Sequence, residues 1–300
     1  MTIKPILAAI GIVCAALYII PQAETATADC RITTSAAALS LEHTGSYKTS
    51  LNKKALDNLE DYITGVVAAE MPASYNSEAL MAQAIAARTY ALREMEKNPS
   101  VPLTSIGQAY ISKDTMRERW GESYRELYEK VRTAVSSTEG MIITYDNEPI
   151  LAAFCASSGG VTEKSENVRG SALHYLTAVD SHWDSAADGF TQTKAYTEGE
   201  LDSLLGGVPE IQAKSQSGYV LSARVGGKVL TGMQIRQRLS LKSAAFDVKY
   251  TDGKIYITTR GYGHGVGMSQ TGANGMAEEG NTFRQILAHY YPGTEISICR

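Results

Sequence analysis

The chain has 300 residues, which is enough for one large domain or two small ones. Its hydrophobic content of 44% and its charged content of 20% are those of an ordinary globular protein, and a net charge of −4 without a run of basic residues argues against nucleic-acid binding. Tyrosine dominates the aromatic residues, with 17 tyrosines against four phenylalanines and two tryptophans. Tyrosine suits polar grooves that hold sugars, and it suits half-buried strands as well.

An apolar run lies close to the N-terminus. Residues Ile6–Ile20 contain no charged side chain and follow Lys4. This length is short for a membrane-spanning helix and long for a core helix, so it predicts either a signal anchor or a signal peptide cleaved near Ala28. We interpret residues 1–28 as an uncleaved anchor with its linker, residues 29–50 as a further linker, and residues 51–300 as the folded domain. The basic N-terminus then stays in the cytoplasm, and the domain lies across the membrane from it.

The first helix of the domain is predicted from about Leu51 to Glu70. Its apolar stripe passes through Ile63 and Val67 at helical spacing, and the next position of that stripe is Glu70. Pro72 ends the helix, which leaves Glu70 in the last turn among apolar neighbours. Burial and the helix dipole both favour the protonated acid there, as a general acid requires. The alternative is an ionised glutamate paired with an arginine or a lysine.

A second helix is predicted to begin at Asn76 or Ser77 and to end before Pro99. Arg88 falls on its apolar face. The spacing leaves two interpretations open. Arg88 forms a buried ion pair with Glu70, or it lies in the wall of a groove that binds substrate.

Hairpins and irregular segments alternate in the middle of the chain. Residues 101–119 show no clear pattern, and a helix is predicted over residues 123–137. Three hairpins are predicted, with turns at Asp146–Asn147, Gly226–Gly227 and Asp252–Gly253. Residues 168–207 are predicted to be rich in loops, and their histidines have no metal-ligand spacing.

Two glycine-rich segments are candidates for the walls of a site. The loop over residues 156–160 contains Ser157 and Ser158, and its glycines permit close approach of a ligand, although a plain flexible loop has the same composition. The segment GYGHGVGMSQ, residues 261–270, places glycines on both sides of His264 and ends at Gln270. Such a turn is typical of an active-site wall and also of a structural turn with a bonded histidine. Ser269 is predicted to cap the helix that follows.

Two sets of stretches together resemble the stage II sporulation protein D family, which includes the amidase-enhancer proteins. The first set is GVVAAEMPASY with EALMAQAIAARTYAL, and the second is GYGHGVGMSQTGANGMAEEGNTFRQILAHYYPGTEI. FCASSGGVTEKSENV and YLTAVDSHWD resemble the middle segment of the family, so the likeness extends over about residues 51–298. It implies that Glu70 occupies the position of the catalytic glutamate and that Arg88 occupies the position of the motif arginine.

This resemblance implies a single-pass membrane protein whose domain faces the wall space, on the mother-cell side of the engulfing membrane. The implied activity is that of a lytic transglycosylase in forespore engulfment, with peptidoglycan glycan strands stripped of stem peptides as substrate. The implied partner is the sporulation amidase or endopeptidase that removes those peptides. We expect Glu70 to protonate the glycosidic oxygen and then to deprotonate the muramic C6 hydroxyl, which leaves a 1,6-anhydro end. The residues expected to bind or orient sugar are Arg88, Ser157, Ser158, His264 and Gln270.

The sequence departs from the family at Cys155, where the family often has a histidine. Some relatives use that histidine with downstream His and Cys residues to hold zinc. The downstream residues here are Val161, Glu166 and Asn167, which do not form a zinc set, so we expect no metal and no other cofactor. Cys155 is expected to be a small buried hydrophobic residue.

These elements predict a mixed α/β fold of the α+β class. Helices surround Glu70, several hairpins follow, and residues 261–270 close a groove for glycan. Two other functions remain open. The domain either binds glycan without cutting it and stimulates a cell-wall amidase, or it is a metal-dependent wall hydrolase, against which the scattered histidines argue.

Overall fold

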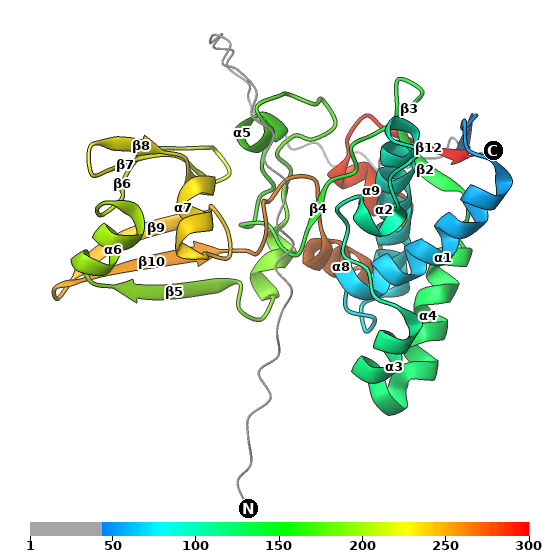
Figure 1. Cartoon of the computed structure of the whole chain (residues 1–300), viewed down its shortest axis with the longest axis horizontal. Helices are drawn as coiled ribbons and strands as arrows, with labels where there is room; N and C mark the ends of the chain where they lie inside the picture. Colours follow the sequence, from blue (N-terminus) through cyan, green and yellow to red (C-terminus); the bar gives the residue numbers. More distant parts are fainter. Residues whose placement is uncertain (1–43, 300) are drawn as a thin grey trace, which may run out of the picture.

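Residues 44–299, which the computed structural model describes, form two lobes with separate hydrophobic cores (Figure 1). The larger core combines residues from both ends of this range, and the smaller core is built from residues 201–257. The domain predicted over residues 51–300 is thus interrupted by a segment with its own core. The predicted anchor lies outside the described residues, and between residues 44 and 299 no helix is long and apolar enough to cross a membrane.

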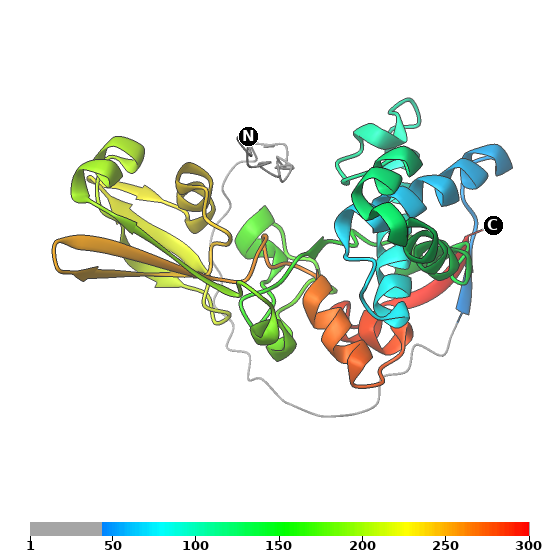
Figure 2. The ribbon, with the colours of Figure 1, turned by 90° about the horizontal axis from the view of Figure 1, so that it is seen from below.

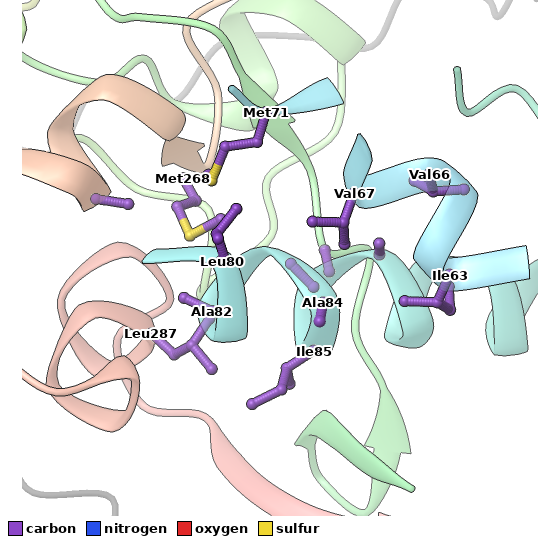
Figure 3. Packing of buried hydrophobic residues seen from close by; sticks show 14 of the residues in the cluster. Ile63, Val66, Val67, Met71, Leu80, Ala82, Ala84, Ile85, Met268 and Leu287 are labelled. Carbon is purple, nitrogen blue, oxygen red and sulfur yellow. The ribbon is translucent and has the colours of Figure 1, made fainter. Parts of the chain in front are cut away.

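Two long helices, α1 (Lys53–Glu70) and α2 (Ser77–Lys97), form the centre of the larger lobe. Asn52 caps α1 and Asn76 caps α2, each through its side-chain oxygen. The stripe predicted on α1 is confirmed, because Ile63 and Val67 are fully buried. It packs against α2, whose many alanines allow the two helices to approach closely (Figure 3).

Shorter helices surround this pair. They are α3 (Lys113–Trp120), α4 (Tyr124–Ser136), α8 (Gln270–Glu278) and α9 (Phe283–Tyr290), with the 3-10 turns η1 (Leu103–Ser105) and η2 (Gly121–Ser123). The helix predicted over residues 123–137 and the Ser269 cap are confirmed. All of helix α3 but its last residue lies inside residues 101–119, which were predicted to be irregular. Met116 is the only buried residue of α3, so the helix has no apolar stripe from which the sequence could predict it.

A four-stranded sheet covers one side of the larger lobe, in the order β1-β12-β2-β3. Its strands are β1 (Thr44–Tyr47), β2 (Met141–Tyr145), β3 (Glu148–Pro149) and β12 (Glu295–Cys299). Strand β1 runs parallel to β12, in the register Thr44 to Ile296. The prediction of a linker over residues 29–50 is therefore wrong at its C-terminal end. A four-residue strand with a partner about 250 residues away leaves no local pattern to read.

The smaller lobe contains two three-stranded sheets and two helices (Figure 1). One sheet has the order β5-β10-β9 and the other β6-β7-β8, built from β5 (Thr191–Tyr196), β6 (Glu210–Lys214), β7 (Val220–Val225), β8 (Lys228–Leu230), β9 (Phe246–Thr251) and β10 (Lys254–Arg260). The helices are α6 (Glu198–Leu205) and α7 (Gly232–Leu239). The smaller lobe contains two of the three predicted hairpins, β7–β8 and β9–β10, and the larger lobe contains the third, β2–β3. Both central residues of each turn have positive φ, as type I′ turns require.

Two stretches of the chain, residues 154–186 and 261–269, lie between the lobes and together form what we call the linking segment (Figure 2). Here β4 (Phe154–Cys155) pairs in parallel with β11 (Met268–Ser269), next to α5 (Ser165–Arg169) and η3 (His182–Ala186). Single bridges join Ser157 to Tyr262 and Glu163 to Val266. The two glycine-rich segments noted in the sequence are therefore neighbours. As a whole the fold is α+β, as predicted.

Candidate functional site

Glu70 is the last residue of α1, and a backbone donor holds its carboxyl group. The next residue, Met71, has extended geometry with φ −123° and ψ 139°, as expected before Pro72. Oε1 of Glu70 accepts a hydrogen bond of 2.8 Å from the N–H of Ala109. In the described range, no Lys, Arg or His forms an ion pair with Glu70. The alternative of an ionised glutamate paired with a cation therefore has no support here.

Burial raises the pKa of the Glu70 carboxyl group, and the hydrogen bond from Ala109 opposes that shift with a smaller effect. The side chain is partly buried, so part of its surface stays open to a ligand. An accessible carboxyl group with a raised pKa has the property needed of an acid that later acts as a base.

The loop over residues 107–111 carries the donor to Glu70 and is fixed to both long helices. On one side of Ala109, Nε2 of Gln108 donates to the carbonyl of Ala87 on α2 at 3.2 Å. On the other side, the N–H of Ile111 donates to the carbonyl of Gly65 on α1 at 3.2 Å. Sequence reasoning missed this loop, since its role depends on backbone donors, which no residue type reveals.

Arg88 forms its ion pair with Glu60 and not with Glu70, and its buried side chain does not lie in a groove wall. Neither interpretation of the sequence is therefore confirmed. Its side chain is 1% exposed, and it donates to both carboxylate oxygens of Glu60 at 2.6 and 2.8 Å. Further donors bind the carbonyls of Met141 and Val135. A guanidinium buried and engaged in this way has no surface for sugar. The structure makes Arg88 a residue that joins α1, α2, α4 and β2, and the predicted sugar contact finds no support.

Gln270 lies against α2, the helix to which the loop that holds Glu70 is also bound. Its Nε2 donates to Oε1 of Gln83 at 3.3 Å, and Gln83 lies one helical turn from Ala87, where Gln108 binds. Gln270 is 4% exposed. The Nε2 of Gln83 is buried without a hydrogen-bond partner among the described residues. Gln270 and the loop that holds Glu70 therefore bind the same helix, and Gln270 has little open surface.

A groove of about 840 Å³ lies where the linking segment meets α8. Its lining includes Tyr75, Ser157, Trp183, Lys242, Tyr262, Thr271 and Glu278. Glu70 is not part of this lining. Tyr75 belongs to the loop that follows Glu70, and its hydroxyl lies 3.5 Å from that of Thr271, the residue after Gln270. Figure 3 shows Met71 and Met268, which belong to the same core, on one side of Leu80.

The two predicted serines have different positions. Ser157 lines the groove, whereas Ser158 is fully buried and donates from its N–H and its hydroxyl to Asp184 at 2.8 and 2.6 Å. Asp184 also accepts from the hydroxyl of Ser269 at 2.5 Å. Burial raises the pKa of Asp184, against the effect of these donors. Asp184 therefore fastens the serine loop to the cap of α8, a role that its sequence position did not reveal.

His264 lies in the linking segment as a bonded, neutral residue. Its Nδ1 accepts from the N–H of Val266 at 3.0 Å, and the ring also bonds the backbone of Phe154. Burial, with help from the charges of Arg169 and Arg236, lowers the pKa of His264 to about 4. Of the two interpretations of residues 261–270, this geometry supports a structural turn with a bonded histidine. The neighbouring Cys155 is 5% exposed, which confirms that it is buried.

Comparisons with known proteins show the family of this chain. A family model described as "Stage II sporulation protein" matches residues 47–145. Stage II sporulation protein D of Bacillus subtilis is 44% identical over 254 residues, which cover 80% of this chain and 74% of that protein. The protein of the same name from Bacillus amyloliquefaciens is 41% identical over 84% of this chain and 77% of its own length. The amidase enhancer of Bacillus subtilis is 29% identical over 78% of this chain and 40% of its own length. The chain belongs to the stage II sporulation protein D family.

Proposed function

We propose that this protein is a peptidoglycan lytic transglycosylase in which Glu70 is the acid and base. The observation that supports this most is the Glu70 carboxyl group itself, which has a raised pKa, no ion-pair partner among residues 44–299, and one backbone donor that fixes its orientation. We also propose that the protein acts on the wall during sporulation, in line with its family.

The bond from Ala109 assigns the two carboxyl oxygens different tasks. Oε1 is an acceptor for the N–H, so the acidic proton resides on Oε2. Oε2 gives this proton to the oxygen between N-acetylmuramic acid and N-acetylglucosamine as the bond to the muramic C1 breaks. The resulting carboxylate takes the proton of the muramic C6 hydroxyl, whose oxygen bonds to C1. The proton on Glu70 is thereby restored, and no water is consumed.

An intramolecular nucleophile explains why one carboxyl group suffices. Hydrolytic glycosidases usually flank the bond with two carboxyl groups, one of which activates water or attacks C1. Asp184 and Glu163 are fully buried carboxyl groups, the first engaged by Ser158 and Ser269 and the second by Asn167 and Ser215, so neither is available for that task.

We propose glycan strands without stem peptides as the substrate, supplied by a wall amidase or endopeptidase. Removal of the peptide leaves a free lactyl carboxylate on each muramic residue. Lys242 lines the groove with its ammonium 4.0 Å from the ring centre of Tyr262, and no carboxylate in the described range pairs with it. It is suited to bind such a carboxylate, whereas Ser157 and Tyr262 offer hydroxyl groups to the sugars.

The test compares wild type with Glu70→Gln on peptide-free glycan strands, with the products identified by mass spectrometry. The proposal predicts 1,6-anhydro ends from wild type and a loss of about 10²-fold or more in Glu70→Gln. Reducing ends from wild type would instead indicate a hydrolase.

A second function is favoured by the likeness to the protein named amidase enhancer. In that case the domain binds glycan and stimulates an amidase without cutting. The same experiment separates the two, because an enhancer leaves the strands intact with either protein and retains binding in Glu70→Gln.

A further inference from the structure

Tyr110 is an exposed aromatic side chain next to the residue that holds Glu70. The residue is 41% exposed. The buried tyrosines of the larger core, such as Tyr62 and Tyr290, are at most 6% exposed. The neighbour of Tyr110, Ala109, donates to Glu70. Tyr110 therefore places an aromatic ring at the surface, next to the residue that holds Glu70.

The ring of Tyr110 is held in place from below. It stacks on Tyr62, with ring centres 5.5 Å apart and planes inclined by 10°. It also lies against Gly65, where an added Cβ would come within 2.3 Å of the Tyr110 ring. One face of the ring therefore rests on α1, and the exposed remainder forms a rigid aromatic surface.

Tyr110 lies beside α1 shortly before the end of the helix at Glu70. Gly65, beneath Tyr110, precedes Glu70 by five residues, which is about 7.5 Å of helix. A glycan cut at Glu70 extends beyond the cut bond in both directions, so an exposed ring beside Glu70 is within its reach.

We propose that Tyr110 is a sugar-stacking residue that binds the glycan beside Glu70. This inference rests on the proposed function, since it takes Glu70 as the point of cleavage. The flat face of a pyranose ring carries C–H groups that pack on an aromatic face, and the negative face of the ring attracts those hydrogens. Tyr110 therefore determines how the strand lies across Glu70.

The test measures binding of peptide-free glycan strands in the Glu70→Gln background, where the strands are not cut. We expect Tyr110→Leu to weaken binding about tenfold and Tyr110→Phe to leave it within about twofold, because leucine fills the space over Gly65 without a flat face. Tyr250, 61% exposed on β9 of the other lobe, gives the matched control, and Tyr250→Leu is expected to leave binding unchanged.

A reporter variant keeps the proposal testable if Tyr110→Leu folds poorly. When strands are added, Tyr110→Trp is expected to show a fluorescence change beyond that of Tyr250→Trp, whose response reports only the native tryptophans, including Trp183 in the groove. One result would overturn the proposal: Tyr110→Leu leaves binding unchanged in the Glu70→Gln background but lowers the rate of cleavage when Glu70 is present. Tyr110 would then only support the loop. Loss of binding without any cleavage by wild type would retain Tyr110 as a sugar-binding residue and refute the transglycosylase instead.

Discussion

Arg88 binds Glu60 through two hydrogen bonds, from Nε to Oε1 at 2.6 Å and from Nη2 to Oε2 at 2.8 Å. The pair joins the two long helices, α1 and α2. Arg88 is buried, whereas 23% of the Glu60 side chain is exposed. Removing one partner of such a pair leaves the other charge buried without compensation.

We therefore expect Glu60→Gln to lower the free energy of unfolding by about 3 kcal/mol, at the lower end of the range for buried pairs because Glu60 is partly solvated. Urea denaturation monitored by circular dichroism measures this change. Arg117→Gln, which removes a highly exposed pair with Asp114, is the control and should cost less than about 1 kcal/mol. Equal effects of the two variants would contradict the structural role of Arg88.

The Gly65→Ala variant tests the loop without touching Glu70 directly. The new Cβ would lie 2.3 Å from the Tyr110 ring and 2.8 Å from the carbonyl oxygen of Ile111, so the loop has to move. Ala109 then loses its bond to Glu70. We expect kcat to fall by about 10²-fold, the usual cost of a misplaced catalytic group.

The pH–rate profile gives this variant a distinctive signature. The bond from Ala109 lowers the pKa of Glu70, so its loss raises that pKa and moves the basic limb of the profile to higher pH. Gly199→Ala, where an added Cβ meets nothing within 4 Å, serves as control. A lower rate with an unmoved basic limb would mean that the loop does not act through the Glu70 carboxyl group.

His264 makes stability depend on pH in a defined window. Its pKa is lowered to about 4 in the folded state from an ordinary value of 6.5. The unfolded chain therefore binds the proton more tightly, so stability is fully present above pH 6.5 and is lost as the pH falls towards 4. NMR titration of the imidazole should give a midpoint near 4, and a midpoint above 6 would refute the neutral, bonded His264.

Lys242 is expected to distinguish glycans by charge. We predict that Lys242→Met weakens binding of peptide-free peptidoglycan strands several-fold and hardly changes binding of chitooligosaccharides, which have no lactyl carboxylate. Raising the salt concentration should reduce the difference between wild type and variant, because salt screens a half-exposed pair. An equal loss for both glycans would assign Lys242 to packing against Tyr262 alone.

Local patterns predicted the parts of the fold that local energies determine. The stripe ending at Glu70, the caps at Asn76 and Ser269, and the turn at Asp252–Gly253 all depend on residues within a few positions of one another. The raised pKa of Glu70 was predictable for the same reason, since Pro72 fixes where the helix ends.

Contacts between distant segments could not be predicted in this way. Arg88 and Glu60 are 28 positions apart, and Glu70 and Ala109 are 39 apart, so no periodicity connects them. A charge on an apolar face indicates that a partner exists, but several carboxylates were available to Arg88. Strand β5, mostly exposed, likewise lacks the apolar alternation that identifies a strand.

The parallel pairing of β1 with β12 has a mechanical consequence. The first described residue, Thr44, lies opposite Ile296, and the pairing continues in register to Tyr47 and Cys299. A pull on the chain at Thr44, directed along the strand, loads all four residue pairs together in shear instead of opening them one after another. Tension transmitted along the polypeptide from its N-terminal side is thus borne by this sheet edge before it reaches α1 and Glu70.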